Sequence, residues 1–176
     1  IDAPLGGTPA QAQTGELSAM VGADAATFAR VKPVIEAWAA RVVHVGDVGV
    51  GHKMKLLNNF LSMGYAAIYA EALTIAQKSG VSPQVFDSVL RGSRMDCGFY
   101  QTFFKYVIER DRNAHLFTMK NALKDVRYLD AMANTAGVAD PIATAVRNSF
   151  ALAVAGGKGD EFVPMLSDFV AEINGT

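Results

Sequence analysis

The 176-residue chain is short of cysteine, of charge and of long apolar runs. Its single cysteine, Cys97, excludes an internal disulfide framework and fits a reducing compartment such as the cytoplasm. No apolar run reaches the roughly 18 residues that a membrane span needs. The formal net charge of −1 argues against a role driven by charge on nucleic acid or on a membrane surface. Hydrophobic residues, by contrast, make up 51 % of the chain, so it can bury a proper core.

Other signals are missing as well. No histidine lies near Cys97 in the sequence, so we interpret it as a structural or incidental thiol and expect neither a catalytic cysteine nor a metal site. The chain begins with Ile1 inside a strand-like run, without an initiator methionine or a basic leader. We therefore expect that an N-terminal part is missing.

Residues 1–46 have an α/β pattern. The expected elements are strands over 1–5, 16–22 and 41–46, and a helix from Ala25 to about Ala40 that is capped by Asp24. The apolar stripe of this helix consists of Phe28, Val31, Val34, Ile35 and Trp38. Three strands cannot form a self-sufficient sheet with both faces covered. Residues 1–46 are therefore predicted to be the C-terminal edge of an incomplete α/β domain.

From residue 47 onward the pattern is helical only, which makes the predicted fold class mainly α. Helices are expected over 50–79, 83–90, 99–109, 117–136 and 141–155, with a last one capped by Asp160 and ending near 173. Residues 47–176 would form one all-helical domain, and the long helix 50–79 would link it to the α/β part. Aromatic residues at helical spacing, as in 99–109, indicate a core or a dimer interface.

The segment Gly49–Asn59 opens the long helix. Gly51, Lys55 and Asn59 stand four residues apart and therefore share one helix face. Flanking apolar residues suggest that the helix is otherwise buried: Leu56, Leu57, Phe60, Leu61, Ile68 and Leu73. Desolvation and the positive end of the helix dipole would both lower the pKa of Lys55 toward a value suited to proton transfer. The alternative is a lysine that extends its amine to solvent beside a capping loop.

Three motifs, in order and spacing, resemble the β-hydroxyacid dehydrogenase family, which includes 3-hydroxyisobutyrate dehydrogenase and tartronate semialdehyde reductase. They are Asp2-Ala3-Pro4-Leu5-Gly6-Gly7-Thr8 with Ala12 and Gly15, then Gly49-Val50-Gly51 with Lys55 and Asn59, and finally Phe117 with Lys124-Asp125. The resemblance implies a Rossmann NAD(P)-binding domain, of which only the edge is present. It also implies a helical domain like the C-terminal one of 6-phosphogluconate dehydrogenase.

The resemblance implies that a hydride passes between NAD or NADP and a small 3-hydroxyacid or its semialdehyde. Lys55 would be the general acid and base. The implied substrate-binding residues are Gly6, Gly7, Thr8, Gly51 and Asn59, and the implied cofactor-binding residues are Phe117, Lys124 and Asp125. Gly51 would leave room for a ligand. A homodimer or homotetramer is expected because apolar helices lacking a partner domain would expose a large patch.

Two departures from the family pattern matter. The chain has no Gly-x-Gly-x-x-Gly turn for the pyrophosphate, so the fragment alone is expected to be inactive. Gly6 stands where many members have a serine, which leaves the substrate open. The alternative function is a non-catalytic helical dimerisation module of the same fold. The presence of Lys55 favours the enzyme, and it also argues against relatives that reduce imines, which usually replace this lysine. Without the resemblance, Lys124-Asp125 would be interpreted as a solvated helix face.

Overall fold

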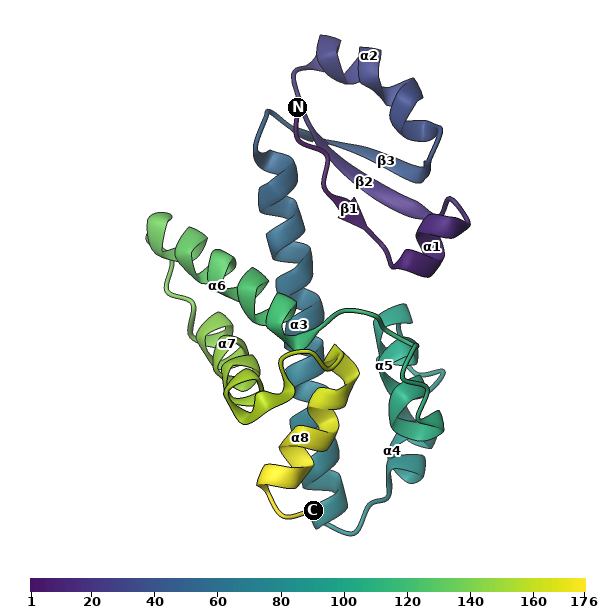
Figure 1. Cartoon of the computed structure of the whole chain (residues 1–176), viewed down its shortest axis with the longest axis vertical. Helices are drawn as coiled ribbons and strands as arrows, with labels where there is room; N and C mark the ends of the chain where they lie inside the picture. Colours follow the sequence, from purple (N-terminus) through teal and green to yellow (C-terminus); the bar gives the residue numbers. More distant parts are fainter. The chain divides into compact units, whose positions relative to one another are not determined.

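A computed structural model describes all 176 residues. The chain forms two compact units, residues 1–58 and 59–176, and the division falls within the long helix α3 (Val50–Lys78). Helices dominate and the only sheet has three strands, so the prediction of a mainly α chain with a remnant of an α/β domain is confirmed (Figure 1). No helix is long and apolar enough to cross a membrane.

The first unit is built on the small sheet. Strand β1 (Leu5–Gly6) is antiparallel to β2 (Leu17–Gly22), and β2 is parallel to β3 (Ala39–Gly46). The short helix α1 (Pro9–Gln13) connects the first pair of strands, and α2 (Ala25–Glu36) makes the crossover to β3 (Figure 1). The predicted strand–helix–strand order is therefore present. The strand expected over 1–5 was wrong in its bounds, because only Leu5 and Gly6 pair continuously with β2, whereas Asp2 forms an isolated bridge to Gly22.

Helix α2 ends at Glu36, four residues earlier than expected. The reason is that Ala39 already pairs with Leu17 of β2, so the backbone must become extended there. Only part of the expected stripe is buried: Phe28, Val31 and Ile35 pack on the sheet core. Val34 and Trp38 are exposed, and their assignment to the buried face was wrong.

The second unit is a helical bundle. It contains the rest of α3 together with α4 (Pro83–Leu90), α5 (Gly98–Glu109), α6 (Met119–Thr135), α7 (Pro141–Ala153) and α8 (Leu166–Ile173). A π-helical turn at Val154–Lys158 and a 3-10 turn at Val163–Met165 lie between α7 and α8. Aromatic side chains of α5 fill the core, where Tyr100, Phe103 and Phe104 are fully buried. Of the two alternatives predicted for this aromatic helix, a core or a dimer interface, the structure therefore shows the core.

The segment before α8 departs from the prediction. Asp160 does not cap the last helix, which begins only at Leu166. Instead, backbone bonds join this segment to the start of α6: the N–H of Met119 donates to Glu161 O at 2.8 Å, and the N–H of Val163 donates to Phe117 O at 2.8 Å. These bonds require extended backbone on both sides. They explain why α6 begins at Met119 and why α8 begins late.

Helix α3 is buried on one face only. Its inner face contributes Met63, Ala66, Ala70 and Leu73 to the core. On its outer face, Leu61, Ile68 and Ile75 are 59 %, 59 % and 65 % exposed, and Leu57 is 41 % exposed. The expectation that Leu57, Leu61 and Ile68 are buried was therefore wrong. The apolar residues on α3 therefore divide between the core and a surface stripe with a seven-residue spacing, which is close to two helical turns.

Candidate functional site

The predicted substrate loop lies at the turn from β1 to α1. Gly7 has φ 126°, and a Cβ there would lie 2.7 Å from Leu17 Cδ2, so glycine is required by the backbone and by packing. Thr8 is the N-cap of α1, and its hydroxyl and N–H both bond to Gln11 in a capping box. Gly7 and Thr8 thus shape the loop whether or not they contact substrate, and their role as ligands stays a prediction.

Asp2 holds the N-terminus of α3. Its carboxylate accepts hydrogen bonds from the N–H of Gly49 at 2.6 Å and from the N–H of His52 at 2.7 Å. Burial opposes ionisation of this group, which is only 8 % exposed, but the two backbone donors outweigh it and the pKa of Asp2 is lowered. The sequence alone does not predict this role of Asp2. The available signal was that α3 has glycine, not a capping side chain, directly before Val50.

Gly51 packs against the chain itself. A Cβ at this position would lie 2.5 Å from Met20 O, 2.7 Å from Asp2 Oδ2 and 3.1 Å from Pro4 Cδ. The glycine is therefore explained by the close approach of α3 to the sheet. Close packing is thus a sufficient reason for glycine here, and the predicted role of Gly51 in binding a ligand stays a prediction.

Lys55 and Asn59 lie one turn apart on α3, where the helix passes from the first unit to the second. Lys55 is half-buried, not fully desolvated. The Asp2 carboxylate lies at the N-terminus of this helix and compensates its positive end.

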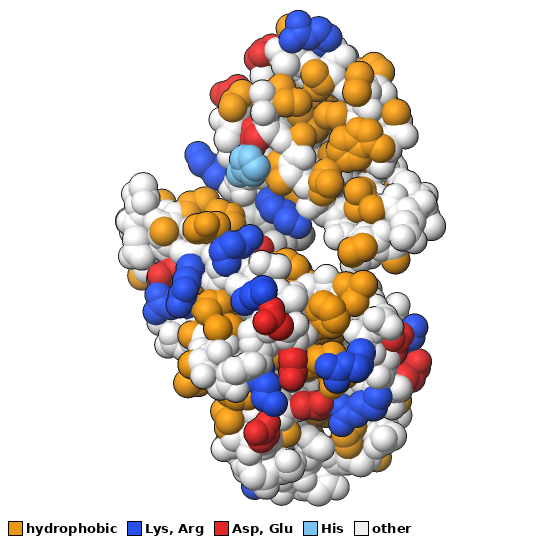
Figure 2. Space-filling model, viewed as in Figure 1, with side chains coloured by type: hydrophobic (Ala, Val, Ile, Leu, Met, Phe, Trp, Pro, Cys, Tyr) orange, Lys and Arg blue, Asp and Glu red, His pale blue; other side chains and the backbone are white.

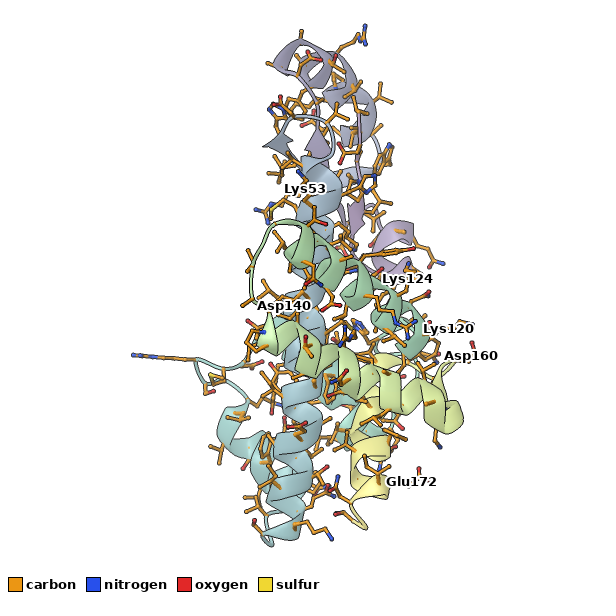
Figure 3. All side chains as sticks on the ribbon, turned by 90° about the vertical axis from the view of Figure 1, so that its left-hand side faces the viewer. Lys53, Lys120, Lys124, Asp140, Asp160 and Glu172 are labelled. Atoms are coloured by element: carbon orange, nitrogen blue, oxygen red, sulfur yellow. The ribbon has the colours of Figure 1, made fainter.

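The second unit joins two of the three motifs. Asn59, 8 % exposed, donates from Nδ2 to Asp125 Oδ2 at 2.7 Å, and Lys124 Nζ lies 3.2 Å from Asp125 Oδ1. Lys124 is itself half exposed and projects from α6, as Lys120 does (Figure 3). The alternative interpretation, that Lys124 and Asp125 lie on a solvated helix face, therefore holds for Lys124 only. The Asp125 carboxylate is largely buried between the Asn59 amide and the Lys124 ammonium. Phe117 lies two residues before α6 and is half-buried.

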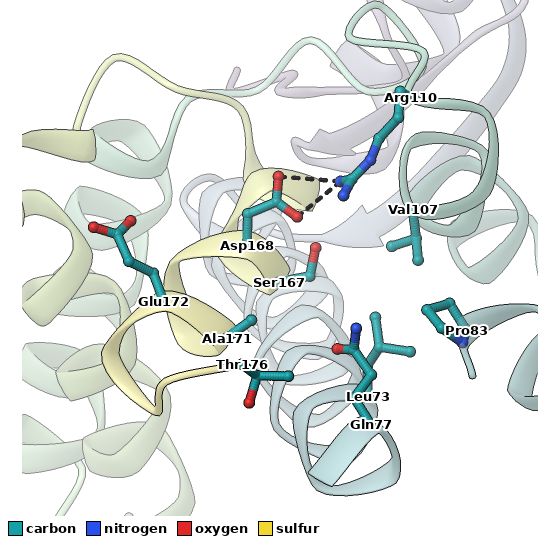
Figure 4. A pocket seen from close by; sticks show the side chains of 10 residues that line it. All are labelled: Leu73, Gln77, Pro83, Val107, Arg110, Ser167, Asp168, Ala171, Glu172 and Thr176. Atoms are coloured by element: carbon teal, nitrogen blue, oxygen red, sulfur yellow. Dashed lines mark hydrogen bonds and ion pairs between the residues drawn. The ribbon is translucent and has the colours of Figure 1, made fainter. Parts of the chain in front are cut away.

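A pocket elsewhere in the second unit contains none of the predicted site residues. It has a volume of about 330 Å³ and lies between α3, α5 and α8. Arg110 and Asp168 form an ion pair of 2.8 Å at its edge (Figure 4). Tyr106 donates a hydrogen bond to the same carboxylate at 2.6 Å. Burial and this bond raise the pKa of Tyr106 to about 12. The ion pair satisfies both charges, so the pocket is not a candidate for the chemistry.

Two protein-family models match the chain. Residues 49–167 match the family described as NAD-binding of NADP-dependent 3-hydroxyisobutyrate dehydrogenase. Residues 1–46 match the NAD binding domain of 6-phosphogluconate dehydrogenase. The first match covers more than half of the chain.

Individual relatives agree with the family. The 3-sulfolactaldehyde reductase of Escherichia coli is 28 % identical over 159 residues, which is 90 % of this chain and 53 % of that protein. The 3-hydroxyisobutyrate dehydrogenase of Pseudomonas aeruginosa is 40 % identical over 93 residues, which is 53 % of this chain and 31 % of that protein. The crystal structure of 3-hydroxyisobutyrate dehydrogenase from Salmonella typhimurium has a TM-score of 0.85 at 25 % identity, over 96 % of this chain and 59 % of that chain.

This chain thus spans between about a third and three fifths of the length of these relatives. Both family models describe domains that bind a nicotinamide dinucleotide, in agreement with the predicted cofactor, NAD or NADP. Over the length that it spans, the order of motifs, the fold and the family match all agree. The chain belongs to the β-hydroxyacid dehydrogenase family.

Proposed function

We propose that this chain supplies the proton-transfer and substrate-binding part of an NAD(P)-dependent hydroxyacid dehydrogenase or semialdehyde reductase. The observation that carries the proposal is the bond between Asn59 and Asp125, with Lys124 on the other carboxylate oxygen. It joins two motifs that are 66 residues apart in the chain. A buried amide held in one orientation, one helical turn from a half-buried lysine, is suited to binding and protonating a small oxygen substrate.

Lys55 is the proton-transfer residue in this proposal. During reduction, the Lys55 ammonium would donate a proton to the carbonyl oxygen of the substrate, while a bound nicotinamide cofactor would supply the hydride for the carbonyl carbon. During oxidation, the neutral amine takes that proton back as the hydride leaves the carbinol carbon. Each direction therefore needs Lys55 in a different protonation state.

Asn59 and Asp125 orient the reacting groups. Because one N–H of the Asn59 amide is committed to Asp125, the direction of its carbonyl oxygen is also determined. Asp125 in turn compensates the charge of Lys124, which with Phe117 would approach the cofactor. Basic side chains gather over α6, where Lys120, Lys124 and Arg127 are exposed (Figure 2). Lys120 and Lys124 pair with Asp160 and Asp125, so an anionic dinucleotide would compete with these carboxylates for them.

The substrate is a small 3-hydroxyacid or its semialdehyde in this proposal. Two relatives named above act on such compounds by their names, 3-sulfolactaldehyde and 3-hydroxyisobutyrate. The loop of Gly6, Gly7 and Thr8 would offer backbone N–H groups to the acid group of the substrate. Gly6 contributes no hydroxyl, and a Cβ at this position would lie 2.5 Å from Ser18 Oγ, so a larger residue would require the Ser18 hydroxyl to move. The acid group is therefore bound without a serine at this position.

A substrate panel tests the proposal. The complete protein is assayed with NADH and NADPH against small semialdehydes, and with the oxidised cofactors against the matching 3-hydroxyacids. We expect turnover of at least one semialdehyde that bears an acid group. We also expect the 176-residue chain alone to show no cofactor-dependent turnover, because it contains no Gly-x-Gly-x-x-Gly turn and spans only part of its relatives. Absence of turnover in the complete protein with the whole panel would favour the non-catalytic dimerisation module.

The outer face of α3 supports a homodimer or homotetramer. Leu61, Ile68 and Ile75 form an exposed apolar stripe there. Such a stripe on a long helix is typical of an interface. We expect Ile68→Glu to lower the mass measured by light scattering toward that of a monomer, because a buried unpaired carboxylate is strongly disfavoured. Val89→Glu, at an exposed position of α4, is the matched control and should leave the mass unchanged. An unchanged mass in Ile68→Glu would remove α3 from the interface.

A further inference from the structure

We propose that Asp2 is a positioning residue for Lys55: its carboxylate fixes where α3 begins and thereby where the lysine stands. This inference rests on the proposed function, because it takes Lys55 as the proton-transfer group. Lys55 lies about one and a half turns from the first residue of α3. A displacement at the helix start is therefore carried to Lys55 with little attenuation, since a helix is stiff over this length.

The carboxylate takes up donors that the helix cannot satisfy itself. The first N–H groups of any helix lack partners within it, and α3 has no capping side chain directly before Val50. Both oxygens of Asp2 are used, Oδ1 by the N–H of Gly49 and Oδ2 by the N–H of His52. Asp2 is 47 residues upstream of Gly49, so this is a tertiary cap and not a local one. It ties α3 to the sheet.

Asp2 is itself held in place. Its N–H donates to Gly22 O at 3.1 Å, and its carbonyl accepts from the N–H of Gly22 at 2.9 Å, which fixes its backbone beside the end of β2. Two glycines make room for the carboxylate. A Cβ on Gly22 would lie 2.3 Å from Asp2 Oδ1, and one on Gly51 would lie 2.7 Å from Oδ2. A side chain at either position would displace the carboxylate, so the arrangement depends on both glycines.

The charge of Asp2 strengthens the tie. A buried carboxylate between two N–H donors at a helix N-terminus remains ionised to low pH, which agrees with its lowered pKa. Charge-assisted bonds of this kind are stronger than bonds between neutral groups. An asparagine would keep one acceptor oxygen and lose the charge, whereas an alanine would lose both acceptors. The two variants therefore weaken the tie by different amounts without changing any residue that contacts the reacting atoms.

The test compares Asp2→Asn and Asp2→Ala in the complete protein, with Asp24→Asn as the matched control. Asp24 caps α2 in the same unit by the same chemistry, accepting from the N–H of Thr27 at 2.9 Å. We expect kcat to fall about tenfold in Asp2→Asn and about a hundredfold in Asp2→Ala, since small misplacements of a catalytic group have effects of this size. The KM for the nicotinamide cofactor should stay within about twofold. Asp24→Asn should leave kcat unchanged, with little loss of thermal stability, because asparagine caps a helix about as well as aspartate does.

Two further measurements separate positioning from a general loss of structure. In a Lys55→Ala background, Asp2→Asn should cause no further loss of turnover, because the group it positions is absent. The backbone amide NMR signals of Gly49 and His52 should shift upfield in Asp2→Asn, while those of α2 stay in place. Unchanged kcat in both Asp2 variants, or a further tenfold loss in the Lys55→Ala background, would overturn the inference. Near-normal kcat in Lys55→Ala alone would instead overturn the proposed function.

Discussion

Replacing Lys55 by alanine in the complete protein is expected to lower kcat by about 10²–10⁴-fold, the usual contribution of a general acid or base. Binding of the nicotinamide dinucleotide should be retained, because the predicted cofactor contacts lie on other residues, among them Phe117 and Lys124. The measurement is steady-state turnover in both directions together with a fluorescence titration of NADH or NADPH. The pH profile of kcat should lose the limb that reports the lysine.

Lys53→Ala is the matched control for this prediction. Lys53 is exposed on the same helix, two residues earlier and therefore on another face (Figure 3). The Lys53→Ala substitution removes the same charge from the same helical turn as Lys55→Ala. Any general effect of lost charge on α3 therefore appears in both variants. We expect kcat of Lys53→Ala to remain within about twofold of the unmodified enzyme, as is usual for exposed residues without a role. Turnover of Lys55→Ala near that of Lys53→Ala would contradict the assignment.

The same substitution at two glycines of α3 is expected to have opposite effects on stability. Gly51→Ala should lower the free energy of unfolding by about 1–3 kcal/mol, as overpacking does. The new methyl group would meet the carbonyl oxygen of Met20 at 2.5 Å, and backbone of β2 cannot move aside as a flexible side chain could. It would also press on the carboxylate of Asp2, at 2.7 Å, and so strain the cap of α3. We expect Gly51→Ala to lower turnover as well as stability.

Gly64→Ala is the control, fourteen residues from the end of the same helix. A Cβ there has no neighbouring atom within 4 Å. Alanine should therefore raise the free energy of unfolding by about 0.5–1 kcal/mol, because it restricts the unfolded chain and favours the helix. Equilibrium urea denaturation of both variants measures the two effects. A stability of Gly51→Ala equal to or above that of the unmodified chain would contradict the packing at the α3–sheet junction.

Most of the secondary structure could be predicted from local signals. The helix α4 begins with a Ser82 cap and Pro83, and its predicted bounds match the structure. The start of α2 is determined in the same way by Asp24. Predictions failed where backbone partners come from distant segments: at Ala39, which pairs with β2, and at residues 161–163, which bond to the start of α6. Local propensity contains no information about such partners.

For the candidate site, too, the features set by local sequence could be predicted and those set by distant segments could not. The spacing of Gly51, Lys55 and Asn59 on one helix face follows from the helical repeat, and so it could be deduced from sequence. The bond of Asn59 to Asp125, the tertiary cap formed by Asp2 and the reason for Gly51 could not, because each depends on segments brought together by packing. The same holds for the outer face of α3, since an apolar residue on a helix can face either the core or an exposed surface.

The sequence by itself determined the family, the mainly helical class and the helix that carries Lys55. These depend on motifs and periodicities that lie along the chain. Only the tertiary structure decided what supports that helix: a carboxylate 47 residues upstream that accepts from its first turn, and two glycines that let helix, strand and carboxylate approach closely. Hydrogen bonds and steric contacts act over a few ångströms in space, and sequence separation does not reveal them.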